Sequence, residues 1–158
     1  MTLMEAIRSG FSPVAMVVFS SVFVTLYAAH QVGDHWVQTH RQACSKGEHS
    51  RAGQRACAWH VLTLTLTKFA ALYGLVFVTG LPITFWPLFV GMSVDALSHY
   101  YADRRYTLRN LAAKLGKADF YELGDPKASP CGTGAYALDQ SWHVGWLFVT
   151  SLIIAAGA

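Results

Sequence analysis

Three segments of the sequence place a histidine and an aspartate four residues apart. The pairs are His30/Asp34, His99/Asp103 and Asp139/His143. Residues four apart in an α-helix lie on one face, so each pair would direct an imidazole and a carboxylate to the same side. These two groups together are typical ligands of zinc, manganese and non-haem iron. The spacing therefore indicates a metal site built from helices.

The composition indicates that these helices belong to a membrane protein. Of the 158 residues, 53% are hydrophobic and 13% are charged, whereas soluble domains carry about 25% charged residues. Four segments approach the roughly 20 residues that a helix needs to cross a bilayer; they span about 11–38, 56–78, 81–102 and 135–156. We expect one all-α membrane domain over residues 1–158, with four transmembrane helices in an antiparallel bundle.

The basic residues predict the orientation of this bundle. Ten of the 12 lysines and arginines fall in two connections, residues 39–55 and 103–134. The positive-inside rule places both loops in the cytoplasm and both termini outside. Apolar residues recur at helical spacing within 107–121, which predicts a short interfacial helix between the third and fourth spans. The expected partner is membrane lipid, and the basic residues form no nucleic-acid patch.

With this topology the polar residues of all four spans lie at one depth. The first and third spans carry their pairs in the last turns, and the second and fourth carry theirs in the first turns. Seven ligands would converge near the cytoplasmic surface: His30, Asp34, His60, His99, Asp103, Asp139 and His143. Seven ligands are more than one tetrahedral ion can use, so we expect two metal sites. Zinc is the expected ion, with manganese or iron as alternatives.

The carboxylates of the set could also perform chemistry. Asp34, Asp103 and Asp139 are the candidate catalytic residues, because a carboxylate beside a metal-activated water can act as general base. Three further residues are expected to hydrogen-bond to the ligands and orient them: Gln38, Gln140 and Asp95. Three further histidines are expected outside the site: His35, His40 and His49.

Two other features are less directly tied to the site. Lys68 lies in the middle of the second span, two turns deeper than His60, and should either pair with an aspartate or extend towards an interface. Cys44, Cys57 and Cys131 form no CxxC motif, so neither a disulfide framework nor a zinc knuckle is indicated.

The order of these motifs resembles a known family. HxxxD with a following glutamine (His30 to Gln38), His60 alone, HxxxD again (His99, Asp103) and DQxxH (Asp139 to His143) resemble an uncharacterised family of small four-helix bacterial membrane proteins, labelled a domain of unknown function. That family is similar in pattern to inner-membrane proteins regarded as metal-dependent hydrolases. The resemblance implies a compact helical membrane protein with a hydrolytic metal site.

The leading functional hypothesis is therefore a metal-dependent hydrolase of an ester or phosphoester, with lipid among the substrates considered. The alternative is a membrane protein that binds, senses or transports a metal ion or protons without catalysis. A b-type haem bundle would also use histidines on facing helices, although the neighbouring aspartates disfavour it. A homodimer formed through a lipid-facing side is compatible with four spans.

Overall fold

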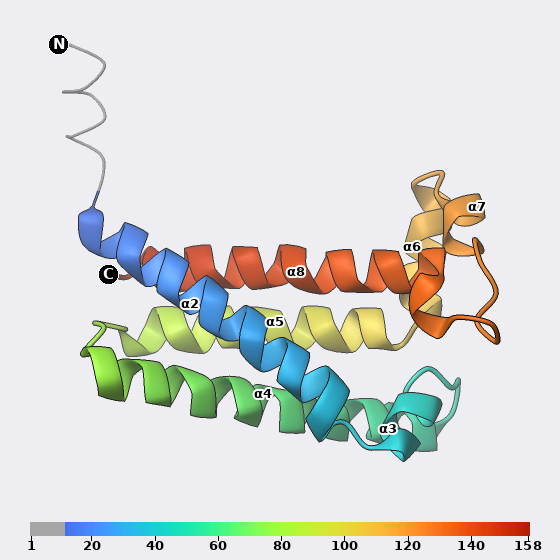
Figure 1. The fold of residues 1–158 in the computed structure, drawn as a ribbon, viewed down its shortest axis with the longest axis horizontal. Helices are drawn as coiled ribbons and strands as arrows, with labels where there is room; N and C mark the ends of the chain where they lie inside the picture. The colour runs from blue at the N-terminus through green and yellow to red at the C-terminus, as the bar shows by residue number, and fades with distance from the viewer. Residues whose placement is uncertain (1–11) are drawn as a thin grey trace, which may run out of the picture.

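The computed structural model describes residues 12–158, and this part of the chain contains helices and loops without any strand. Four long helices make up most of it (Figure 1): α2 (Pro13–Val32), α4 (Arg51–Thr79), α5 (Phe85–Asp103) and α8 (Gly134–Ala155). A π-helical turn, η1 (Gly33–Val37), continues α2 directly. The predicted all-α fold is confirmed.

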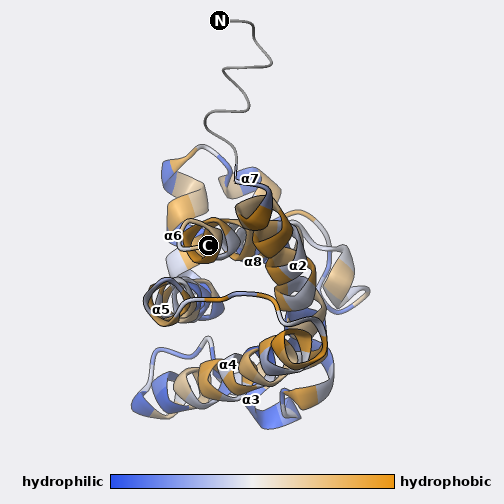
Figure 2. Ribbon diagram, turned by 90° about the vertical axis from the view of Figure 1, so that its left-hand side faces the viewer, coloured by the Kyte–Doolittle hydropathy of each residue, from blue (hydrophilic) through white to orange (hydrophobic). Residues whose placement is uncertain are grey.

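The long helices form an antiparallel bundle. α2 and α5 run towards the end that carries the short helices, and α4 and α8 return from it (Figure 1). Viewed along its length, the bundle has the circular order α2, α4, α5, α8 (Figure 2), and each helix contacts its two neighbours. Glycine permits one of these approaches, because a Cβ at Gly91 of α5 would lie 3.1 Å from the Thr150 carbonyl oxygen of α8.

The first connection is more helical than the sequence analysis predicts. Thr39 and Gln42 form a reciprocal capping box that begins α3 (His40–Ser45). The Ser50 hydroxyl accepts a hydrogen bond from the Gly53 N–H at 2.9 Å, so α4 begins at Arg51 rather than near residue 56. The T-x-x-Q pattern that begins α3 falls within residues 39–55, the segment predicted to be a basic loop.

The second connection folds over the same end of the bundle. It contains α6 (Tyr106–Lys114), α7 (Ala118–Tyr121) and the 3-10 turn η2 (Pro130–Gly132). The segment 107–121, expected as one short helix, is thus divided in two. Gly116, with φ 70°, lies at the break because α6 ends there in a left-handed residue.

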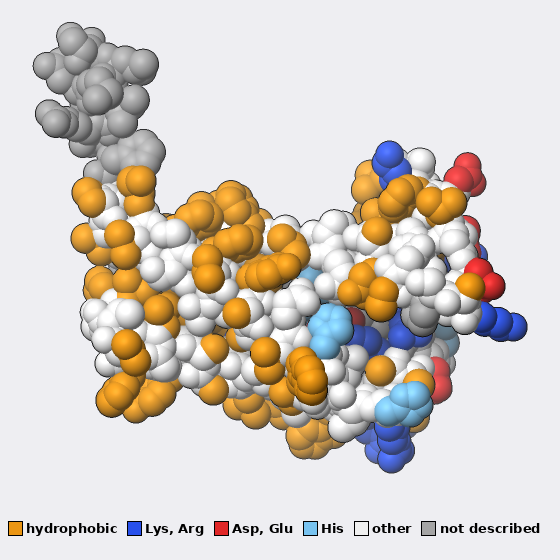
Figure 3. Space-filling view, viewed as in Figure 1, with side chains coloured by type: hydrophobic (Ala, Val, Ile, Leu, Met, Phe, Trp, Pro, Cys, Tyr) orange, Lys and Arg blue, Asp and Glu red, His pale blue; other side chains and the backbone are white. Residues whose placement is uncertain are grey.

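Apolar side chains fill the half of the bundle that is remote from α3, α6 and α7. Val18, Val22, Leu72 and Ile154 are among the buried residues of this core. Hydrophobic side chains also cover much of the outer surface, whereas charged residues and histidines gather at the end with the short helices (Figure 3).

Two helices of the described chain, Pro13–Val37 and Arg51–Thr79, are long and apolar enough to cross a membrane. This agrees with a membrane protein. The expected four spans and their orientation stay predictions.

Candidate metal centre

The seven predicted ligands come together at one end of the bundle. His30 and Asp34 come from α2 and η1, His60 from α4, and the remaining four from α5 and α8. All four histidines are buried, with at most 3% of each residue exposed. All four long helices therefore contribute to one polar cluster inside a largely apolar bundle.

The π-helical turn positions the carboxylate of Asp34. Its closing hydrogen bond runs from the Gln38 N–H to the Gly33 carbonyl oxygen at 2.9 Å, which inserts one residue relative to an α-helical turn. Gly33 lies directly against the side chain of Leu64 on α4, where any larger residue would overlap it. Asp34 Oδ2 consequently remains 3.5 Å from His30 Nε2 while Oδ1 faces the other helices.

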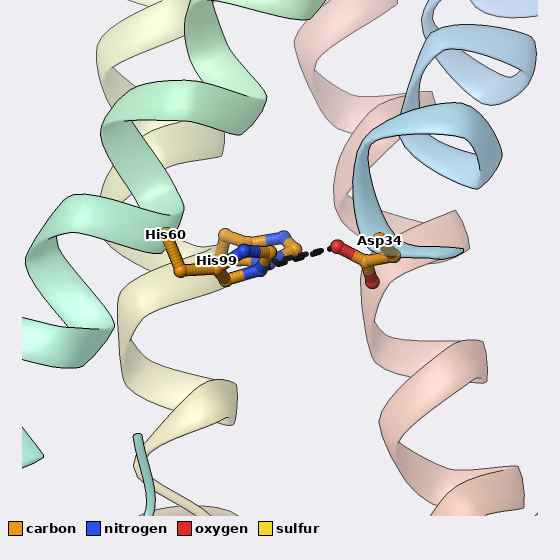
Figure 4. A group of neighbouring side chains, drawn as sticks. All are labelled: Asp34, His60 and His99. Atoms are coloured by element: carbon orange, nitrogen blue, oxygen red, sulfur yellow. Dashed lines mark hydrogen bonds and ion pairs between the residues drawn. The ribbon is translucent and has the colours of Figure 1, made fainter. Parts of the chain in front are cut away.

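One group of three ligands consists of Asp34, His60 and His99 (Figure 4). His60 Nε2 lies 3.1 Å from His99 Nε2 and 3.2 Å from Asp34 Oδ1, and His99 Nε2 lies 3.7 Å from the same oxygen. Two ligands of one tetrahedral zinc ion lie roughly 3.4 Å apart, given metal–ligand distances of about 2.1 Å. The three atoms have the spacing of one face of such a coordination shell.

A second group of three shares His99 with the first and adds Asp103 and His143. His99 Nε2 lies 3.2 Å from Asp103 Oδ2, and His143 Nε2 lies 3.8 Å from Asp103 Oδ1. The imidazoles of His99 and His143 stack with centroids 4.0 Å apart. Such direct contact between the rings leaves no room for a porphyrin between them, so the cluster does not fit haem.

Several atoms of the cluster are buried without a hydrogen-bond partner. They include His30 Nε2, Asp34 Oδ1, Asp103 Oδ2 and His143 Nε2. These atoms have ion-pair neighbours within 4 Å, but the directions do not suit hydrogen bonds. Because buried polar atoms are rarely left unbonded, a cation that accepts their lone pairs would satisfy them together. The residues present therefore fit a metal ion, whose identity and number stay predictions.

Lys46 is a site residue that sequence analysis did not single out. Its Nζ lies 2.8 Å from Asp103 Oδ1. Arg104, at the end of α5, donates from Nη1 to the Lys46 carbonyl oxygen at 2.8 Å and from Nη2 to the Glu48 carbonyl oxygen. Arg104 thereby fastens the connection between α3 and α4 over the metal centre, and nothing in the local sequence of Lys46 signals this.

The three predicted supporting residues behave differently. Gln140 donates from Nε2 to Asp139 Oδ2 at 3.3 Å, and Gln38 lies in the wall of the adjacent cavity. Asp95 instead pairs with Lys68, whose Nζ lies 2.9 Å from Oδ1 and 2.7 Å from Oδ2. Lys68 thus finds the aspartate partner that the sequence analysis considered for it.

A cavity of about 510 Å³ opens beside the cluster, and Asp34, Asp103 and Asp139 all form part of its wall. The Asp139 side chain is the most accessible of the three carboxylates at 27% exposure, against 9% and 2% for the others. Figure 3 shows histidine and cationic atoms within a hollow at this end of the molecule. The carboxylates thus face the cavity.

Two further side chains that can form hydrogen bonds line the cavity, those of Tyr121 and His35. Burial raises the pKa of Tyr121 above its ordinary value of 10, and its hydroxyl donates to the Arg105 carbonyl oxygen at 3.5 Å. His35, expected outside the site, also lies on the wall, and its Nδ1 is 2.9 Å from the Gln31 carbonyl oxygen rather than near the cluster.

Comparison with protein families shows where the sequence belongs. The family described as "Protein of unknown function (DUF3307)" matches residues 22–157. The chain belongs to this family. The DUF3307 match includes all seven residues of the cluster and the whole cavity wall, so the candidate site lies within the family's domain. Comparison with curated proteins and with solved structures gives no match.

Proposed function

We propose that this protein is a metal-dependent hydrolase of the bacterial inner membrane, which cleaves an ester or phosphoester at the cytoplasmic end of a four-span bundle. The observation that carries the proposal is the arrangement of the cluster. Four buried imidazoles direct Nε2 towards oxygens of Asp34, Asp103 and Asp139, and all three aspartates line a cavity large enough for a substrate group.

The lipid-facing surface supports four spans. α5 and α8 expose large apolar side chains, including Leu97 (72%), Phe89 (54%) and Phe148 (47%). α5 has 19 residues, or roughly 28 Å, and so matches the hydrocarbon core of a bilayer. Its polar residues, such as Asp95 and His99, are buried inside the bundle. These residues make α5 less hydrophobic than the most apolar stretches of the two helices that are apolar enough to cross a membrane. Polar residues that face a bundle interior are compatible with a membrane helix.

The residues that would hold the metal ions are the two groups of three that share His99, with His30 beside them. A divalent ion bound there would act as a Lewis acid towards an ester or phosphoryl oxygen and favour deprotonation of water. Asp139 is suited to be the general base because it is the most exposed carboxylate and Gln140 orients it. Asp139 Oδ1 lies 3.4 Å from His143 Nε2, which places this carboxylate beside the second group of ligands.

A non-enzymatic conduit is the second candidate, favoured by the buried Lys68–Asp95 pair deeper in the bundle. Intramembrane ion pairs often mark proton or ion paths. The core beyond this pair is largely apolar, with Val22, Leu72 and Met92 buried there. The Thr150 and Ser151 hydroxyls are also buried at that depth, but both donate to backbone carbonyl oxygens of the bundle. The hydrolase proposal is therefore stronger. Flux of protons or metal ions through proteoliposomes that is lost in His99→Ala would favour the conduit instead.

The proposed function is tested by metal content and hydrolysis measured on the same purified samples. We expect the wild-type protein to contain a divalent metal by elemental analysis and to cleave nitrophenyl esters or phosphodiesters. His99→Ala should lose both properties, and Asp139→Asn should retain metal but lose hydrolysis. His40→Ala is the matched control, since His40 is exposed on α3 at the same end of the molecule. A wild-type protein without stoichiometric metal, or hydrolysis that persists in His99→Ala, would refute the proposal.

A further inference from the structure

An apolar groove lies on the outside of the bundle, between α6 and α8. Its volume is about 370 Å³, and most of its lining is apolar, including Leu111, Leu115, Trp146 and Val149. Leu108 lines both this groove and the polar cavity beside the metal centre. The two hollows are therefore neighbours that share one side chain as a common wall.

The groove extends away from the metal centre along α8. Its lining on that helix runs from Leu138 to Val149, roughly 16 Å along the helix axis. It therefore starts beside the cavity and continues towards the middle of the bundle. In a bilayer that covers the apolar outer surface, its far part would lie at the depth of lipid acyl chains.

One wall of the groove is fixed by Trp142 of α8, which binds the neighbouring helix α5. Trp142 Nε1 donates to the Ser98 carbonyl oxygen on α5 at 3.1 Å, and its ring stacks on Tyr101 with centroids 5.5 Å apart. Opposite, α6 buries Leu108 and Ala112 towards the bundle. The groove is thus lined by side chains fixed on both helices.

Positive charge is present where a headgroup would lie. Arg105 is in the wall of the cavity, and so is Lys46, whose Nζ is paired with Asp103 Oδ1. Lysine and arginine are the usual protein partners of phosphate oxygens. A molecule with a phosphate group at one end and an acyl chain at the other fits this arrangement, in which the polar cavity and the apolar groove meet at Leu108.

Resting on the proposed hydrolase function, we infer that the substrate is a phospholipid that enters sideways from the bilayer. Its phosphate-bearing headgroup occupies the cavity beside Asp103 and Asp139, and one acyl chain occupies the groove between α6 and α8. The scissile ester or phosphoester then lies near Leu108, where the two hollows meet.

Gly145 offers a way to fill the groove without disturbing the fold. It lines the groove, and a Cβ built there meets nothing within 4 Å. Gly145→Leu should therefore place a side chain in the acyl position while also favouring the helix. Gly74→Leu is the matched control, because Gly74 is an exposed glycine of α4 with equally open surroundings and lies outside the groove.

The experiment uses the full chain in phosphatidylcholine nanodiscs that contain a trace of phosphatidic acid with a diazirine in one acyl chain. After irradiation, labelled peptides are mapped by mass spectrometry, and metal content is measured on the same samples. We expect labelling concentrated on α6 and α8 in the wild type and in Gly74→Leu. Labelling of these helices should fall at least about fivefold in Gly145→Leu, with metal content unchanged.

Each other outcome overturns a separate part of the argument. Labelling spread evenly over the outer helices, and equal in both variants, would refute the acyl groove while leaving the hydrolase proposal intact. A dimer that dissociates in Gly145→Leu would identify the groove as a self-association surface and likewise refute it. Groove-specific labelling in a protein that binds no metal would refute the hydrolase and leave a lipid-binding site.

Discussion

His60 Nε2 and His99 Nε2 lie 3.1 Å apart, although the two residues are separated by 39 positions and belong to different helices. Two imidazole nitrogens at this distance repel each other unless one carries a proton or both share a cation. Asp34 Oδ1 and Asp103 Oδ2 lie 3.2 and 3.1 Å from the same His60 nitrogen. This concentration of lone pairs at a buried point is the feature from which the metal predictions follow.

The first prediction concerns how many ions each histidine holds. His99 belongs to both groups of three ligands, whereas His60 belongs to one and His143 to the other. Because His99 Nε2 has a single lone pair, it can bind only one ion at a time. If two ions are bound, His60→Ala and His143→Ala should each lose about half of the bound metal, and His99→Ala at least half of it. Elemental analysis of the purified variants measures this directly. Loss of nearly all the metal from every one of the three variants would indicate a single ion instead.

The second prediction concerns Lys46, which contacts Asp103 Oδ1 at 2.8 Å and leaves Oδ2 to face His60 and His99. Lys46→Met removes that restraint on the carboxylate. We expect metal affinity to fall about 10–100-fold, as is usual for residues that orient a ligand. A competition titration with a fluorescent chelator measures the affinity, and Lys114→Met, on the exposed side of α6, is the control. Equal affinity in both variants would show that Asp103 is held without Lys46.

The third prediction concerns the stability of the Lys68–Asp95 pair, in which both side chains are almost fully buried. Removing one partner leaves an unpaired buried charge, which costs about 3–5 kcal/mol. We expect Lys68→Met and Asp95→Leu each to lower the unfolding temperature in detergent. The double variant should recover most of the loss because no charge then remains. Additive losses in the double variant would exclude a direct pairing.

How much of this site the sequence predicts depends on the length scale of each contact. Each His/Asp pair is local in the sequence, so helical spacing alone assigns its two side chains to one helix face. Counting residues along the four spans then predicts that the pairs of different helices lie at the same depth in the membrane. For Lys68, the sequence predicts either an aspartate partner or an interface without naming the residue, and the structure identifies Asp95 as the partner.

Other features needed the folded chain. Lys46 contacts Asp103 from a connection whose backbone is bound by Arg104, 58 residues away from Lys46. The π turn at Gly33 likewise lies against the side chain of Leu64 on another helix, a contact that no local pattern in the sequence indicates. These contacts depend on packing between distant segments, so residue types and spacing do not specify them.

The fourth prediction follows from this close approach. Gly33→Ala should push against Leu64 and shift the π turn that orients Asp34. Overpacking of this kind costs about 1–3 kcal/mol, and the loss of Asp34 alignment should weaken metal binding at the same time. Gly74→Ala, at an open position of α4, should instead be neutral or slightly stabilising. Thermal unfolding and chelator competition on both variants provide the comparison, and unchanged metal affinity in Gly33→Ala would separate the turn from the site.

The fifth prediction concerns the orientation of the bundle in the membrane. Cys44 and Cys131 are exposed thiols in the two basic connections, at the end that carries the metal centre, while Cys57 is buried. The proposed topology places both exposed thiols in the cytoplasm. A membrane-impermeant maleimide should therefore label each of them in inverted vesicles and leave them unlabelled in intact spheroplasts.

Single-cysteine variants that retain only Cys44, Cys57 or Cys131 assign the signal to one residue. The variant with Cys57 alone is the internal control, because that thiol should react in neither preparation until detergent and denaturant expose it. Labelling of Cys44 and Cys131 in spheroplasts would reverse the orientation, and labelling of the two from opposite sides would refute an even number of crossings between them. Only labelling of both from the cytoplasmic side places the cavity, and the carboxylates on its wall, at the inner leaflet.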